Sequence, residues 1–203
     1  MEAIRLGFLA SHGGSNVLAI IKAFKEGRLA AAPAVVISNN SGSTALAHAR
    51  NEGVPAYHMS AKTNPDPADL DSRILQVLEK NGVNLVILAG YMKKIGPNTL
   101  NAFNGRILNI HPSLLPRHGG HGMYGQAVHQ SVLQSGDTET GVTIHLVNEE
   151  YDQGAIVSQF LVPVLPTDTA ETLSARVLEQ EHLSYVETIN RIANRMIDLN
   201  TLQ

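Results

Sequence analysis

The chain has no cysteine and no tryptophan among its 203 residues. Without cysteine it cannot form disulfides, thiolate-bound metal or iron–sulfur sites, or a thiol nucleophile, and this fits a reducing compartment such as the cytoplasm. Aromatic residues make up only 4% of the chain. Stacking on nucleic-acid bases is therefore not expected as a general binding strategy.

Long runs of positive charge or of apolar residues are missing as well. The formal net charge is −3, and no run of lysine or arginine is longer than the pair Lys93 and Lys94, which argues against a nucleic-acid surface. The apolar stretch near the N-terminus is far too short to span a membrane or to indicate an export signal. We expect a cytoplasmic protein with small-molecule partners, as a monomer or homodimer, without nucleic acid or membrane contact.

Predicted strands alternate with predicted helices up to residue 111. Such an alternation implies a parallel sheet flanked by helices, and the length suits one domain. The predicted strands cover 4–10, 33–40, 54–59, 83–90 and 106–111, and the predicted helices cover 17–27, 43–53, 68–82 and 95–103.

The pattern changes after residue 111. A helix at 124–136 precedes two apolar strands, 140–148 and 155–165, whose short connection predicts an antiparallel hairpin over 140–165. One long helix or two should then cover 169–198, beginning at Thr169. We therefore predict an α/β fold for residues 1–203: a single domain with an open, mostly parallel Rossmann-like sheet flanked by helices, and an antiparallel hairpin toward the C-terminal half.

A glycine loop, "SHGGSN" at 11–16, joins the first strand to the first helix within the unit 4–27. Gly13 and Gly14 can adopt positive φ, Ser15 or Asn16 can cap the helix, and amides at a helix start favour anions such as phosphate. For the loop taken alone, an ordinary tight turn with a usual helix cap is the preferred interpretation. The second strand ends in Ser-Asn-Asn instead of an acid, which disfavours NAD, and the lysine of a nucleotide-binding P-loop is absent.

A second polar segment closes the strand in "RILNIHPSLLP", residues 106–116. Asn109 and His111 are two residues apart and share a strand face, and Pro112 should end the strand. Ligands of parallel sheets bind beyond the C-terminal ends of the strands. There an asparagine amide can stabilise a negative oxygen, a histidine can move a proton, and Asp152 in the hairpin turn is a candidate partner for that histidine. Each residue alone also fits a structural role.

Four segments together resemble the glycinamide ribonucleotide formyltransferases, which are folate-dependent formyltransferases. "NIHPSLLP" is typical of formyltransferases in general, whereas "GGSN", "YDQGAIV" and "RVLEQEH" (176–182) resemble the glycinamide ribonucleotide branch. The resemblance covers nearly the whole chain. It implies that the amine of glycinamide ribonucleotide attacks the formyl carbon of 10-formyltetrahydrofolate directly, through a tetrahedral intermediate in purine biosynthesis.

The resemblance also implies roles for individual residues. Asn109 and His111 would face the negative oxygen, and Asp152 would keep His111 protonated and help a water move the proton from the amine to the folate nitrogen. Gly14, Ser15 and Asn16 would bind the substrate phosphate, and Glu181 its sugar. The residues implied for the pterin are Met92, Lys93, Ile95, Asn109, Asn148 and Asp152, and no metal is implied.

The chain departs from the family at Leu178, where some members carry a phosphate-binding lysine; Arg176 and the neighbouring loops are candidates to replace it. The segment 117–129, rich in glycine and histidine, has no clear counterpart and is a candidate for a loop that closes over substrate. Its residues His118, His121 and His129 suggest a metal site only weakly, and scattered surface histidines are the preferred interpretation.

Three other functions stay open. A formyltetrahydrofolate hydrolase would replace the amine by water, a methionyl-tRNA formyltransferase would use a different acceptor, and a sugar-phosphate sensor would bind without chemistry. The first two normally carry a further domain, which we do not expect in a chain that begins at its first strand and ends after a helix.

Overall fold

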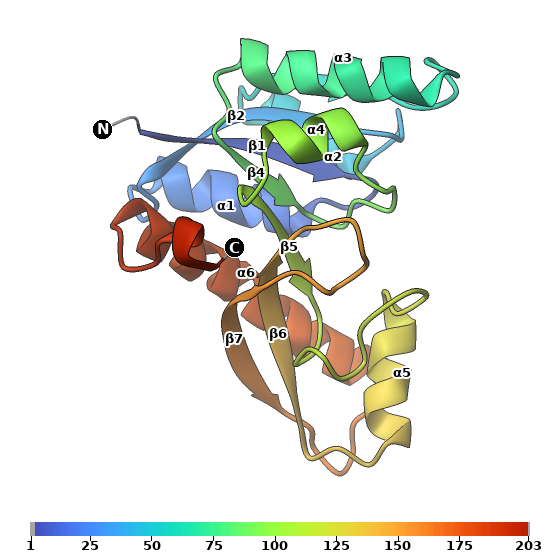
Figure 1. The fold of residues 1–203 in the computed structure, drawn as a ribbon. Coiled ribbons are helices and arrows are strands. Elements are labelled where there is room, and N and C mark those ends of the chain that lie inside the picture. The colour runs from blue at the N-terminus through green and yellow to red at the C-terminus, as the bar shows by residue number, and fades with distance from the viewer. Residues whose placement is uncertain (1–2, 203) are drawn as a thin grey trace.

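A seven-stranded sheet runs through the centre of the molecule in the order β3-β2-β1-β4-β5-β6-β7 (Figure 1). The computed structural model describes residues 3–202, so residues 1, 2 and 203 of the predicted domain lie outside the described residues. The strands are β1 (Ile4–Ala10), β2 (Ala31–Ser38), β3 (Ala56–His58), β4 (Leu85–Leu88), β5 (Ile107–His111), β6 (Glu139–Leu146) and β7 (Ile156–Pro163).

The sheet has a parallel and an antiparallel part. The first five strands pair in parallel, whereas β6 pairs antiparallel with both β5 and β7. This confirms the predicted mostly parallel α/β sheet with a hairpin toward the C-terminal half. Every predicted strand is present, with bounds that differ by a few residues.

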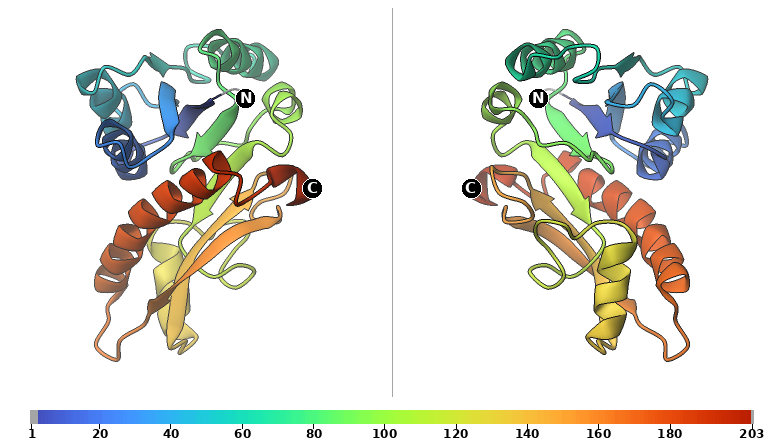
Figure 2. Two further views of the ribbon diagram at one scale, coloured as in Figure 1. Left: turned by 90° about the vertical axis from the view of Figure 1, so that its left-hand side faces the viewer. Right: turned by 90° about the vertical axis from the view of Figure 1, so that its right-hand side faces the viewer.

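Helices cover both faces of the sheet, as the two side views show (Figure 2). Apolar side chains of α1, α2 and α6 share one buried cluster with β1, β4 and β5, whereas α3 packs with the opposite face. Since side chains alternate along a strand, Phe8 belongs to the first cluster and Leu9 to the second. The helices are α1 (Ser15–Lys25), α2 (Thr44–Asn51), α3 (Pro67–Lys80), α4 (Pro97–Ala102), α5 (Gln126–Gln134), α6 (Ala170–Ala193) and the 3₁₀-helix η1 (Leu199–Leu202).

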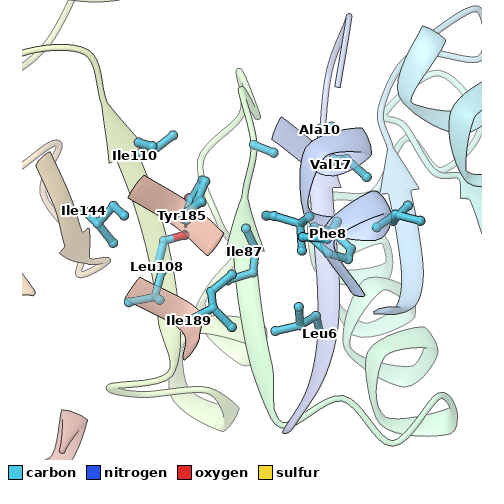
Figure 3. Packing of buried hydrophobic residues seen from close by; sticks show 14 of the residues in the cluster. Leu6, Phe8, Ala10, Val17, Ile87, Leu108, Ile110, Ile144, Tyr185 and Ile189 are labelled. Atoms are coloured by element: carbon cyan, nitrogen blue, oxygen red, sulfur yellow. Dashed lines mark hydrogen bonds between the residues drawn. The ribbon is translucent and has the colours of Figure 1, made fainter. Parts of the chain in front are cut away.

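Tyr185 anchors α6 against one face of the sheet. Its side chain is fully buried between Ile87 and Leu108 (Figure 3), and its hydroxyl donates to the carbonyl of Leu88 at 2.6 Å. A buried tyrosine hydroxyl needs such a partner, and here the partner is the last residue of β4. The contact therefore places the preceding turn of α6 near the C-terminal edge of the parallel strands.

Two local predictions are wrong. The last segment is one helix that ends at Ala193 and not at 198, since Arg195 just beyond it has a positive φ of 59° and η1 follows. Neither Ser15 nor Asn16 caps α1: the cap residue is Gly14, and no side chain accepts there. No helix within residues 3–202 is long and apolar enough to cross a membrane.

Gly14 should be intolerant of a side chain. Its φ is +66°, and an added Cβ would lie 2.4 Å from Cβ and 2.7 Å from Cα of Ala45 at the start of α2. We expect Gly14→Ala to lower the free energy of unfolding by about 1–3 kcal/mol from the backbone conformation alone, and further through the overlap. Urea denaturation measures this loss.

Gly13→Ala is the matched control, because a Cβ at Gly13 meets nothing within 4 Å. This variant should stay within about 0.5 kcal/mol of the parent. Equal stability of the two variants would show that the packing of Gly14 against α2 is not a constraint on the loop.

Candidate active site

Three loops meet at the C-terminal edge of the parallel strands, and Ser11 joins them. Its N–H donates to the carbonyl of Gly90 at 3.1 Å, and its hydroxyl donates to Oδ1 of Asn39 at 2.6 Å and accepts from the N–H of Met92 at 2.8 Å. The loops after β1, β2 and β4 are thus held side by side. The sequence analysis did not single out Ser11, because a serine at a strand end has many structural roles.

Asn109 lies opposite His145 in the antiparallel pairing of β5 with β6. Nδ1 of His145 donates to the carbonyl of Leu146 at 2.8 Å, so that Nε2 can accept from the amide of Asn109 at 3.1 Å. A carboxamide has a second N–H, which can donate to a ligand oxygen. His145 therefore orients the amide that the sequence predicts as an oxyanion donor.

His111, at the end of β5, is held from both ring nitrogens. Nε2 lies 2.7 Å from the carbonyl of His118, and Nδ1 lies 3.5 Å from Oδ2 of Asp152. A carbonyl only accepts, so Nε2 carries a proton. Any second proton on the ring then sits on Nδ1 and faces the carboxylate.

Asp152 lies in the loop between β6 and β7, with a positive φ of 57° that aspartate tolerates better than most residues. Its Oδ2 accepts from the N–H of Gly120 at 2.9 Å, and its Oδ1 lies 3.5 Å from Nε2 of His145. Burial alone would raise the pKa of Asp152, but His145, the Gly120 amide and His111 lower it below its usual value. Asp152 is therefore a carboxylate at neutral pH.

Burial and the facing acceptors act in opposite directions on the second proton of His111. Burial lowers the pKa of His111 below its usual value, although Asp152 and the His118 carbonyl act in the opposite direction. The lowered pKa favours the neutral imidazole at neutral pH. That Asp152 keeps His111 protonated during the reaction stays a prediction.

The structure thus brings Asn109, His111 and Asp152 together, and it adds groups that the sequence analysis missed. The position of His145 depends on the register of β6 against β5, and the position of the Gly120 amide depends on the conformation of a loop. A sequence motif reveals neither. The interpretation of His118 and His129 as surface residues is wrong: 11% of the His118 side chain is exposed, and His129 is 3% exposed.

A small pocket of about 90 Å³ opens beside this cluster. Its lining includes the predicted residues Lys93, Ile95, Asn109, Asn148 and Asp152, together with His145 and Tyr91. Met92 is not part of the lining: its side chain is 42% exposed and its N–H is bonded to Ser11. Ligand pockets usually measure about 300–1,000 Å³, so a bicyclic ring needs the loops of this pocket to move apart.

Asn16 and Glu181 connect α1 to α6 at the other part of the predicted site. Nδ2 of Asn16 donates to Oε2 of Glu181 at 2.7 Å. Burial raises the pKa of Glu181 to about 7, and the hydrogen bond from Asn16 only partly opposes this. Gly14 and Ser15 precede Asn16 directly, so the predicted phosphate and sugar residues lie around one helix start.

Arg176, a candidate to compensate for Leu178, is bonded within the protein. Its guanidinium makes two hydrogen bonds to Asp168, at 2.7 and 2.8 Å, and a third to the carbonyl of Pro163. Three of its five donors are thus occupied near the start of α6, and a role in binding phosphate stays a prediction.

Two further features bear on the choice of site. A larger groove of about 850 Å³ lies between α1 and α6, and its lining includes Lys22, Leu183 and Met196 but none of the predicted site residues among those described. Within residues 3–202, no group of three or more histidine, aspartate or glutamate side chains could hold a metal ion. We place the candidate site at the smaller pocket because the predicted polar side chains converge there, although the groove has the larger volume.

Residues 4–189 match the family model described as formyl transferase, so the chain belongs to the formyl transferase family. The predicted family resemblance is thus confirmed.

Two of the relatives are named phosphoribosylglycinamide formyltransferase. The chain is 40% identical over 181 residues to phosphoribosylglycinamide formyltransferase of Haemophilus influenzae, covering 89% of this chain and 83% of that one. It is 43% identical to the chloroplastic phosphoribosylglycinamide formyltransferase of Vigna unguiculata over 95% of its own length, but it spans only 62% of that relative.

Solved structures with this fold include members of the same family. Glycinamide ribonucleotide transformylase 1 from Symbiobacterium toebii superposes with a TM-score of 0.88 at 40% identity, covering 95% of this chain and 89% of that one. A formyltetrahydrofolate deformylase from Pseudomonas syringae has a TM-score of 0.84 at 22% identity, covering 96% of this chain and 62% of that one. That last likeness concerns the fold alone.

The buried carboxyl of Glu181 should make stability depend on pH. Its pKa is about 7 in the folded protein against a usual 4.5, so its contribution to stability is present below pH 4.5 and is lost as the pH rises through 7. Glu181→Gln keeps an acceptor for Asn16 but does not titrate. From about pH 4.5 to about pH 8, the free energy of unfolding of the parent should fall relative to this variant by about 2–3 kcal/mol.

Urea denaturation of both proteins at several pH values measures the difference. A constant difference across this range would mean that Glu181 is charged in the folded protein.

Proposed function

We propose that this chain transfers the formyl group of 10-formyltetrahydrofolate to the amine of glycinamide ribonucleotide in purine biosynthesis. The observation that carries the proposal is the cluster of Asn109, His111 and Asp152 at the pocket beside β5, in a chain 40% identical to relatives with this named activity. We place residues 1–203 in one formyltransferase domain, with the phosphate-binding unit at 4–27 and the catalytic strand end at 106–116. The site needs no metal, and we expect it to work in the cytoplasm.

The reaction needs donors where negative charge develops. When the amine attacks the formyl carbon, the carbonyl oxygen becomes an alkoxide, and an amide N–H from Asn109 can donate to it. One such donor is worth about 2.7–4 kcal/mol in a transition state. The charge on this oxygen also favours protonation of His111, whose pKa is lowered by burial.

Asp152 would transfer the proton that the attacking amine loses. The attacking amine must lose a proton after the new C–N bond forms, and the folate nitrogen must gain one as its C–N bond breaks. A carboxylate that is ionised at neutral pH can pass this proton on through a water molecule. No covalent bond to the enzyme is required.

Binding of the two substrates would use separate parts of the site. Gly14, Ser15 and Asn16 surround the start of α1, where free backbone amides favour a phosphate, and Glu181 would accept from a sugar hydroxyl. Oδ1 of Asn16 is buried and has no hydrogen-bond partner within the described part of the chain, which supports a ligand donor there. The folate pterin would lie at Lys93, Ile95 and Asn148, with Met92 beside them, once the pocket widens.

A turnover assay tests the proposal directly. Purified protein should consume 10-formyltetrahydrofolate only when glycinamide ribonucleotide is present, because the amine is the nucleophile. Consumption with water alone would indicate a hydrolase, and binding of the ribonucleotide without turnover would indicate a sensor. The absence of any dependence on the ribonucleotide would contradict the proposal.

Asn109→Ala separates an enzyme from a sensor. Removing the donor should lower kcat by about 10²-fold or more, as measured by initial rates at saturating substrate. Asn101→Ala, on the exposed surface of α4, is the matched control and should behave as the parent. Parent-like turnover of the first variant would exclude Asn109 as an oxyanion donor.

Asp152→Asn tests the proton path. The amide oxygen of the new side chain can still accept from Gly120, so the loop contact is kept while the negative charge is lost. We expect kcat to fall by about 10²–10⁴-fold with little change in substrate Kd. Stopped-flow and equilibrium titration separate these quantities, and unchanged turnover would remove Asp152 from the mechanism.

A further inference from the structure

His118 links the loop after β5 to the helix that follows it. Its Nδ1 lies 2.8 Å from the hydroxyl of Ser131 on α5, and its Nε2 lies 2.8 Å from Oδ2 of Asp137, between α5 and β6. Only 11% of the His118 side chain is exposed. We call the three residues His118, Ser131 and Asp137 the His118 clamp.

The backbone of the same segment contacts both proposed catalytic groups. The carbonyl of His118 accepts from Nε2 of His111 at 2.7 Å, and two residues later the N–H of Gly120 donates to Asp152 at 2.9 Å. His118 has a positive φ of 54°, which few residues adopt without local support. One short segment therefore sets the surroundings of both His111 and Asp152.

Side-chain hydrogen bonds hold this segment at few points. Gly119, Gly120 and Gly122 follow His118, and the last two have positive φ. Among the described residues 118–125, His118 is the one whose side chain makes hydrogen bonds outside the loop. Glycine-rich backbone is conformationally free. The clamp therefore acts together with the hydroxyl of Ser113, which donates to the carbonyl of Arg117 at 2.7 Å, in keeping the carbonyl of His118 against His111.

We infer that His118 is a positioning residue, whose clamped imidazole holds the backbone carbonyl that fixes the tautomer of His111. A neutral imidazole can carry its proton on either nitrogen. With the carbonyl in place, the proton stays on Nε2 and Nδ1 is left to face Asp152 and the reacting oxygen. Without it, part of the population carries the proton on Nδ1, and the orientation of the ring is no longer restrained. The kinetic part of this inference rests on the proposed function.

His118→Phe is the first test, because phenylalanine keeps an aromatic ring but makes neither hydrogen bond. A misplaced group can cost up to about 10²-fold, so we expect kcat to fall by about 10- to 100-fold while KM for glycinamide ribonucleotide changes little. The double variant Ser131→Ala/Asp137→Ala, which removes both partners of the imidazole, should reproduce the loss with His118 itself retained. This second route covers the case in which His118→Phe does not fold.

Arg117→Gln is the matched control. Arg117 lies beside His118 and reaches the same carboxylate, with Nη1 3.4 Å from Oδ1 of Asp137, but its side chain is 54% exposed. It should show parent-like kcat.

Nitrogen NMR of ¹⁵N-histidine-labelled protein measures the tautomer of His111 independently of turnover. In the parent, His111 should show a protonated Nε2 and an unprotonated Nδ1 at neutral pH, whereas both clamp variants should show shifts averaged between the two tautomers. A merely structural role would lower Tm and leave the tautomer unchanged. Parent-like kcat and an unchanged tautomer in the variants would overturn the inference, whereas an inactive parent with the expected NMR shifts would overturn only the proposed function.

Discussion

The antiparallel pairing of β5 with β6 is the constraint on which the site depends. The register sets Asn109 opposite His145 and His111 opposite Thr143. The hydroxyl of Thr143 donates to the carbonyl of Ser113 at 2.7 Å and accepts from the N–H of Leu115 at 3.0 Å, so β6 also holds the chain that leaves β5. A shift of one residue would turn these side chains to the opposite face.

Burial of this polar cluster costs desolvation free energy, and it also strengthens the electrostatic interactions within the cluster. A desolvated carboxylate is tolerated only where a donor reaches it, and Oδ2 of Asp152 accepts from the Gly120 amide at 2.9 Å. The same desolvation lowers the pKa of His111, and a negative charge that forms near the ring would raise it again. Fixed donors in such a dry site act more strongly than they would in water.

Helix α6 connects the two parts of the molecule that the proposed reaction needs. Tyr185 bonds to the end of β4, and one turn earlier Glu181 bonds to Asn16 at the start of α1. Residues 165 positions apart in the chain thus lie together at the edge of the sheet. Arg176 of the same helix is bonded to Asp168, and the backbone amides near Gly14 are the donors that we propose for the phosphate.

The sequence by itself determined the order of strands and helices, the parallel half with its hairpin, and the residues Asn109, His111 and Asp152, since hydrophobic periodicity and short motifs are local properties. It did not reveal the His145 partner, the buried state of His118 and His129, the hydrogen bonds of Arg176 to Asp168, or the lowered pKa of His111. Only the tertiary structure decided these, because strand register, loop contacts and desolvation arise between segments far apart in the chain.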